Sequence, residues 1–105
     1  MGAPDELEAD TVIHQPIRLK IMAALNALPD GEAIEFIRLR AILRATDGNL
    51  ATHLGTLEQA GYIEIAKDFV GKKPRTRAML TREGRRAFER HVAYLRDILD
   101  PVSKR

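Results

Sequence analysis

The sequence contains no cysteine and no tryptophan, and it has only two tyrosines and three phenylalanines among 105 residues. Without cysteine there can be no disulfide framework, no cysteine nucleophile and no thiolate metal site. So few aromatic side chains argue against a surface for RNA, which usually needs exposed rings to stack on bases. No apolar run approaches the roughly 20 residues that span a bilayer, and the N-terminus lacks the basic and apolar regions of a signal peptide. We therefore expect a cytoplasmic protein that makes no contact with membranes.

Patterns that mark catalytic and cofactor sites are also missing. The spacing shows no Ser/His/Asp set, no paired acids and no glycine-rich loop that could hold a phosphate. His91 follows Glu89 by two residues, whereas two metal ligands on one helix face are three or four residues apart. His14 precedes Pro16 and is expected at the start of a helix. We expect no enzyme activity, no catalytic residues, no metal and no cofactor.

Charge is distributed unevenly along the chain, although the net charge is only +2. The first ten residues contain four acids and no base, whereas residues 67–90 contain nine bases and three acids. A basic segment of this kind is typical of proteins that bind polyanions. The alternative is an ordinary solvated charged surface. At this length we expect a single domain over residues 1–105.

The spacing of apolar residues predicts four main helices. They cover 16–28, 36–44, 47–60 and 82–99, and the N-terminal extension 1–15 has room for an earlier turn. Asp47 is the expected N-cap of the third helix, Gly61 its C′ residue, and Thr81 the N-cap of the last helix. Alternation predicts strands at 62–69 and 75–80 joined by the turn VGKKP, and the extended segment AIEF can add a third strand.

The third predicted helix has a leucine stripe on one side and small polar residues on the other. Leu50, Leu54 and Leu57 form the stripe, and the opposite side is made of Asn49, Thr52, Gly55, Thr56 and Gln59. A helix fits a DNA major groove only if the side chains facing the groove are modest in size. The basic hairpin that follows completes a helix-turn-helix with a wing, whose cations can follow the phosphate backbone or enter a minor groove.

Three segments resemble the winged-helix transcriptional regulators of the MarR/ArsR type, most closely their small stand-alone members. They are IHQPIRLKIMAAL, DGNLATHLGTLEQAGYIEI and FVGKKPRTRAMLTREGRRAFERHVAYL, and together they span residues 13–95. The resemblance implies an α+β, mainly α, winged helix-turn-helix fold. It also implies a homodimer that binds a pseudo-palindromic operator with its two recognition helices in successive major grooves. Because the second and third helices have no cysteine, the thiolate sensing of some ArsR proteins is not carried over.

The predicted DNA contacts come from the recognition helix and the wing. They are Gly48, Asn49, Thr52, His53 and Thr56 in the helix, and Lys72, Lys73, Arg75 and Arg77 in the wing. We expect Asn49 to be the main reader, since its amide can bond adenine bidentately from the first helical turn. His53 has two interpretations. The pair His53–Leu54 resembles the family's recognition-helix signature, but His53 lies beside the leucine stripe, and this position favours a structural role.

The last helix is expected to form a dimer interface together with the N-terminal segment. Its apolar pattern continues past the length that one small core can cover, through Val92, Leu95, Ile98, Leu99 and Val102. An alternative function is a winged-helix module that binds proteins, but protein interfaces favour large aromatic anchors, which the third helix lacks. The sequence leaves open the operator, the direction of regulation and any small-molecule effector.

Overall fold

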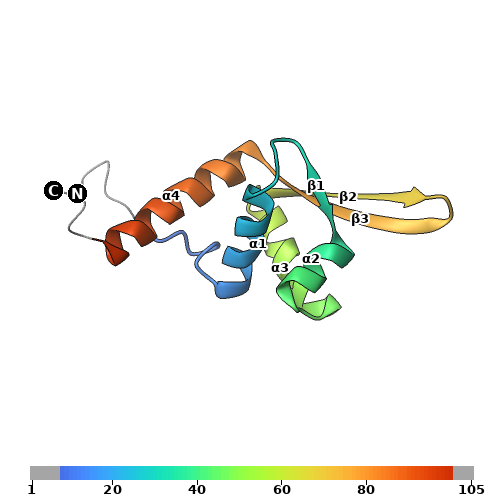
Figure 1. Ribbon diagram of the computed structural model, residues 1–105, viewed down its shortest axis with the longest axis horizontal. Coiled ribbons are helices and arrows are strands. Elements are labelled where there is room, and N and C mark those ends of the chain that lie inside the picture. Colours follow the sequence, from blue (N-terminus) through green and yellow to red (C-terminus); the bar gives the residue numbers. More distant parts are fainter. Residues whose placement is uncertain (1–7, 101–105) are drawn as a thin grey trace.

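The computed structural model describes residues 8–100, which form four helices and one three-stranded sheet. In chain order the elements are α1 (Pro16–Asn26), β1 (Ala33–Glu35), α2 (Phe36–Leu43), α3 (Asp47–Gln59), β2 (Ile63–Val70), β3 (Lys73–Leu80) and α4 (Arg82–Leu99). The molecule is elongated, 57 × 24 × 24 Å, with the β2–β3 hairpin at one end and the far end of α4 at the other (Figure 1). None of the helices in residues 8–100 is long and apolar enough to span a membrane. The predicted winged-helix fold is confirmed.

The core lies between the helices and one face of the sheet. Its largest fully buried side chains are Ile13, Ile21, Met22, Leu25, Leu39, Leu50, Leu57, Ile63 and His91. Leu54 is also buried, at 4% exposure, so the predicted leucine stripe of α3 faces inward as a unit. Burial of such a stripe removes apolar surface from water and fixes which side of α3 remains outside.

The start of α3 differs by one residue from the prediction. Thr46 is the N-cap: its backbone is extended and its Oγ1 accepts a hydrogen bond from the Asn49 N–H at 3.1 Å. Asp47, predicted as the cap, is the first helical residue, and its carboxylate instead accepts a hydrogen bond from Arg40 at 2.6 Å. An acid in the first turn still interacts favourably with the helix dipole. The two candidates are adjacent polar residues, and sequence alone gave no means to choose between them.

The sheet is antiparallel with strand order β1-β3-β2. The hairpin turn contains only Gly71 and Lys72, because Lys73 pairs with Val70 and Pro74 with Phe69. The predicted five-residue turn was therefore too long, and the strands extend to the tip. Proline is tolerated in β3 because β1 reaches only as far as Arg77, so that the edge of β3 beside Pro74 has no neighbour to accept an N–H. Gly71 has φ +63°, as the first position of a tight hairpin turn requires.

The end of α3, the start of β2 and the start of α4 meet at Tyr62. Gly61 has φ +82° and donates to the Glu58 carbonyl at 3.0 Å, while the Tyr62 N–H bonds the Leu57 carbonyl at 3.0 Å, which closes α3 with a Schellman motif. The Tyr62 carbonyl accepts from the Thr81 N–H at 3.0 Å. Gly84 lies so close that a Cβ there would be 2.0 Å from the same carbonyl oxygen. We call this set of contacts the Tyr62 junction.

The N-terminal segment turns at Thr11–Ile13 before α1 and is held by Asp10. The Asp10 carboxylate accepts from the backbone N–H groups of Val12 and Ile13 and from the Tyr62 hydroxyl, the last at 2.6 Å. Burial and the bond to Asp10 raise the pKa of Tyr62 to about 12. The predicted early turn is confirmed, whereas the acidic residues Asp5 and Glu6 and the apolar Leu7 lie outside the described residues.

His91 connects this segment to α4. The ring is completely buried, its Nδ1 accepts from the Asp10 N–H at 3.1 Å, and its Nε2 lies 3.3 Å from Nδ1 of His14. The rings of His91 and Tyr94 stack at 5.6 Å between centroids. Burial, together with the neighbouring His14, lowers the pKa of His91, and Asp10 opposes that shift. His14, predicted as a residue at the start of a helix, is also a partner of α4.

Candidate nucleic-acid interface

The outer face of α3 is small, polar and exposed. Gly48, Asn49, Thr52 and Gly55 are all exposed, and Thr56 is half-buried. The Thr52 hydroxyl donates to the Gly48 carbonyl at 2.9 Å and the Thr56 hydroxyl to the Thr52 carbonyl at 3.3 Å. Each hydroxyl oxygen therefore keeps lone pairs free to accept a hydrogen bond from outside.

The two glycines on this face serve no packing purpose inside the protein. A Cβ added at Gly48 or at Gly55 would meet no atom within 4 Å. Neither glycine has a positive φ. Glycine inside a helix costs about 1 kcal/mol relative to alanine, so its presence here lowers helix stability while leaving the outer surface flat. A flat surface of this kind permits close approach by a partner.

His53 is tied to α1. Its Nδ1 lies 3.1 Å from Nη1 of Arg18, and since a guanidinium only donates, the His53 ring accepts. The Arg18 Nε in turn donates to the Val12 carbonyl. These contacts are of the kind expected for the structural interpretation of His53, and they orient the ring at the edge of the outer face.

Two of the four predicted wing cations are free at the hairpin tip. Lys72 occupies the turn and Lys73 opens β3, and both are exposed. Neither has an acidic partner among residues 8–100. Lysine heads placed on a projecting turn can reach phosphates without first breaking an ion pair.

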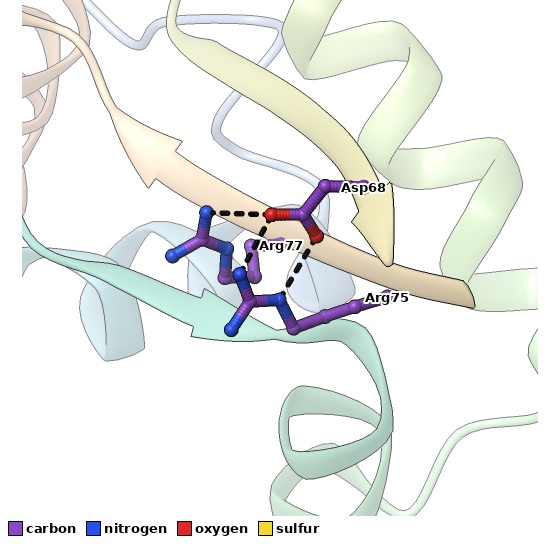
Figure 2. Close-up of polar contacts among 3 residues, drawn as sticks. All are labelled: Asp68, Arg75 and Arg77. Carbon is purple, nitrogen blue, oxygen red and sulfur yellow. Dashed lines mark hydrogen bonds and ion pairs between the residues drawn. The ribbon is translucent and has the colours of Figure 1, made fainter. Parts of the chain in front are cut away.

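Arg75 and Arg77 are engaged by Asp68 on the neighbouring strand (Figure 2). Arg75 binds the carboxylate with two hydrogen bonds, of 2.9 and 2.6 Å, and Arg77 reaches the same carboxylate at 3.3 Å. The hydrogen bond from Arg75 holds the pKa of Asp68 below its ordinary value. All three side chains lie on the sheet face opposite the core, as the pairing of Asp68 with Arg75 and the burial of Ala78 require.

Lys67 is a cation that the sequence analysis left out of the wing. It alternates with Ile63 and Ile65, so it lies on the sheet face that packs against α3. There it lines a cleft of about 510 Å³ together with Gly55 and Glu58 of α3. The alternation of β2 contained this information, because it placed Lys67 on the same side as the buried Ile63 and the partly buried Ile65.

The predicted basic segment 67–90 does not form one surface. Its second half lies on α4, where Arg85 bonds the Asn26 side chain at 2.8 Å and Asp30 at 3.0 Å. Two further exposed bases lie on α2 and in the turn that leads to α3, namely Arg38 and Arg44. The sequence analysis missed both, because FIRLRAILR was used only for its helical period.

The far half of α4 carries the residues predicted for a dimer interface. Val92 packs against the core and Leu95 is half-buried, whereas Ile98 and Leu99 are 57% and 81% exposed. This half of the helix extends away from the domain body (Figure 1). Val102 lies outside the described residues. Within residues 8–100 no group of three or more histidines or acids is placed to hold a metal ion.

A short helix pair, an outward-facing helix with a flat polar surface and a lysine-tipped hairpin beside it define a winged-helix DNA-binding protein of the transcriptional-regulator type. Comparison with known proteins agrees with this class. Residues 17–99 match the model of the winged helix DNA-binding domain family, and the chain belongs to that family. The match is to the family in general, so the MarR/ArsR subtype stays a prediction.

The matches to known proteins cover between 77% and 90% of the chain. An uncharacterised protein of Methanocaldococcus jannaschii is 36% identical over 81 residues, which are 77% of this chain and 85% of that protein. The structure is similar to that of a transcriptional regulator homologue from Pyrococcus horikoshii, with a TM-score of 0.79, 27% identity and 89% of each chain covered. The fold is also shared with the proposed transcriptional regulator ytfH of Salmonella typhimurium, at a TM-score of 0.68, 19% identity, and 90% and 84% coverage.

Proposed function

We propose that the protein is a homodimeric transcriptional regulator that binds specific double-stranded DNA sites. In this proposal α3 enters the major groove, and the hairpin wing contacts the backbone or the adjacent minor groove. The observation that carries the proposal is the outer face of α3, where two glycines without an internal role flank exposed Asn49 and Thr52. A DNA groove needs such a flat and polar surface, whereas a protein partner favours large anchors.

Base reading is assigned to the first two turns of α3. Asn49 bonds to Thr46 only through its backbone N–H, and no residue of the described chain bonds to its side-chain amide, so the donor and the acceptor of that amide are available for an adenine edge. Thr52 and Thr56 have free lone pairs and methyl groups for bases or phosphates, and Gly48 allows the backbone to approach. His53 contributes from the edge of this face, mainly by fixing α3 to α1 through Arg18.

Affinity has to come from outside the recognition helix, because α3 contains no lysine or arginine. We assign phosphate contacts to Lys72 and Lys73 at the hairpin tip and to Arg44 in the turn before α3. Arg75 and Arg77 share one carboxylate, so the three side chains together carry a single positive charge. Contacts of this kind release counterions and make binding steeply dependent on salt.

Dimerisation is assigned to the far half of α4 and the N-terminal segment that packs on it. The helix face that buries Ala87 and His91 continues as Leu95 and Ile98 beyond the protomer's own core. A second copy would cover this apolar surface by a two-fold contact. The proposal keeps residues 1–105 as a single domain and assigns residues 82–105 to dimerisation.

The test is a selection of duplexes from random DNA with the purified protein, followed by affinity measurements on the selected and a scrambled duplex across a salt series. The proposal expects an enriched pseudo-palindrome and a preference that persists at moderate salt. Binding to both duplexes alike would remove sequence specificity from the proposal. Binding to neither at low salt would favour the protein-interaction alternative.

A further inference from the structure

Large apolar side chains are exposed near the tip of the wing, where they belong neither to the core nor to the proposed dimer surface. Phe69 is 69% exposed and Val70 is 57% exposed, and both are followed at once by the turn. Pro74, also exposed, pairs with Phe69 across the hairpin. The protein has only three phenylalanines, and one of them is left in solvent two residues before the hairpin turn.

The strand register gives these residues a direction. Phe69 alternates with Ile63, Ile65 and Lys67, and Pro74 alternates with the buried residues Ala78 and Leu80. Phe69 and Pro74 therefore extend the sheet face that packs against α3, past the end of the core. Val70 and Lys73 form the next pair, one residue nearer the turn, and occupy the opposite face.

Cations frame the apolar pair. Lys67 lies two residues inward on the same face, and Lys72 occupies the turn beyond it. The acid nearest in the strand, Asp68, points to the other face, where Arg75 and Arg77 bind it. A polyanion with apolar surface between its charges matches this arrangement. The minor groove has that character, since phosphates line its walls and stacked bases form its floor.

We propose that Phe69, supported by Pro74, is an apolar wedge that enters the minor groove beside the α3 site and partly unstacks one base step, bending the DNA. The inference rests on the proposed function and gives the wing a reading role in addition to its grip on phosphates. Unstacking is least costly at flexible pyrimidine–purine steps. The wedge therefore selects such a step at a position that no side chain of α3 contacts.

The experiment uses the full-length protein and the selected duplex, end-labelled so that energy transfer reports the bend. Wild type should bend the duplex by an angle in the range of about 20–90° that apolar wedges produce. Phe69→Ala should lose about half of that angle or more, while affinity falls less than about tenfold, because the cost of unstacking disappears together with the contact. Phe69→Leu retains a wedge and should retain most of the bend. Val70→Ala, a matched loss of apolar surface on the opposite face, should behave as wild type.

A second measurement replaces the flexible step under the wing by a stiff A-tract. Wild type should lose affinity for this duplex, and Phe69→Ala should not distinguish it from the original. The wedge proposal is wrong if the wild-type complex shows no bend, or if the Phe69→Ala complex is bent as much as wild type. The exposed apolar residues of the wing would then be assigned to a contact with another protein. In both outcomes specific binding persists, so failure of the wedge is distinct from failure of DNA binding itself.

Discussion

Asp68 on β2 binds Arg75 on β3 through both carboxylate oxygens, with Nε 2.9 Å from Oδ1 and Nη2 2.6 Å from Oδ2. Two parallel bonds of this kind fix a guanidinium more firmly than one. The arginine is therefore oriented along the hairpin and away from α3. Two of the four wing cations predicted to contact DNA are thus held within the protein, and one of their two charges is neutralised.

Removal of this carboxylate should strengthen DNA binding. We expect Asp68→Asn to raise affinity for selected and scrambled duplexes alike at low salt, and to steepen the salt dependence by about one unit of slope, because Arg75 and Arg77 lose their opposing charge. Glu64→Gln is the matched control, since Glu64 is exposed on the same sheet face and carries the same charge, but nearer the domain body. Equal effects of the two substitutions would show that only the net charge matters.

The recognition helix and the wing tip should respond differently to truncation. Asn49→Ala should reduce the preference for the selected over the scrambled duplex by about 1–3 kcal/mol, as expected for one lost bidentate base contact. Lys72→Ala should weaken both duplexes by the same factor and lower the salt slope by about one. Affinities of the two variants for both duplexes across a salt series separate these roles. If both variants lose affinity without losing preference, Asn49 does not read bases.

The Tyr62 junction should tolerate no side chain at Gly84. A Cβ there would lie 2.0 Å from the Tyr62 carbonyl oxygen, and backbone on both sides would have to move. We expect Gly84→Ala to lower the free energy of unfolding by about 3 kcal/mol or more, at the upper end of overpacking effects. Gly55→Ala, where a Cβ meets nothing within 4 Å, should instead raise it by about 0.5–1 kcal/mol. Denaturant unfolding of both variants gives the comparison, and a harmless Gly84→Ala would contradict the packing described.

His91 should make the fold sensitive to mild acid. Its pKa is lower in the folded protein than the ordinary value of 6.5, so the unfolded chain binds the proton more readily. Stability should therefore fall as the pH drops below about 6.5 and level off below the folded-state pKa. His91→Gln keeps an acceptor for the Asp10 N–H but cannot titrate in this range. Urea unfolding between pH 5 and 8 should show a steeper loss for wild type than for His91→Gln, and parallel curves would contradict the assignment.

A charge on the far half of α4 should separate the proposed dimer. We expect Ile98→Asp to yield monomers in sedimentation at micromolar concentration without a change in monomer stability, because Ile98 is 57% exposed within the protomer. Arg86→Asp, on an exposed position in the first half of α4, should leave the dimer intact. Wild type that sediments as a monomer would refute the interface outright.

The sequence was sufficient for the fold because each element has a strong local signal. The leucines of α3 repeat at helical spacing, Gly61 permits the left-handed conformation that ends the helix, and Thr81 caps α4 by accepting from the Gly84 N–H at 2.9 Å. The N-cap of α3 was predicted wrongly because two neighbouring residues, Thr46 and Asp47, can both accept a hydrogen bond from the first turn of a helix. The predicted strand began at Arg75, whereas β3 begins at Lys73 and includes Pro74, which its open edge tolerates.

The contacts between distant residues could not be predicted. Nothing local indicates that Arg18 reaches His53, or that Asp10 and His14 meet His91, because these pairs depend on how the helices pack. The strand alternation did contain the positions of Asp68 and Lys67 on opposite faces. The charges were counted along the chain without assigning each one to a face of the sheet. The predicted contribution of Arg75 and Arg77 to DNA binding was therefore too large, and Lys67 was left out of the wing.

The Tyr62 junction also sets how far apart two copies can place their reading surfaces. The Tyr62 N–H bonds to the last turn of α3, and the Tyr62 carbonyl contacts Thr81 and Gly84 at the start of α4. Because these contacts join the two helix ends directly, no flexible hinge between them can change their angle. In a dimer joined through α4, the distance between the two α3 helices is then fixed by the hydrogen bonds and packing of this junction rather than left to a flexible linker. Operators whose half-sites are moved apart by even one base pair, which also rotates one half-site about the duplex axis, would meet only one protomer at a time.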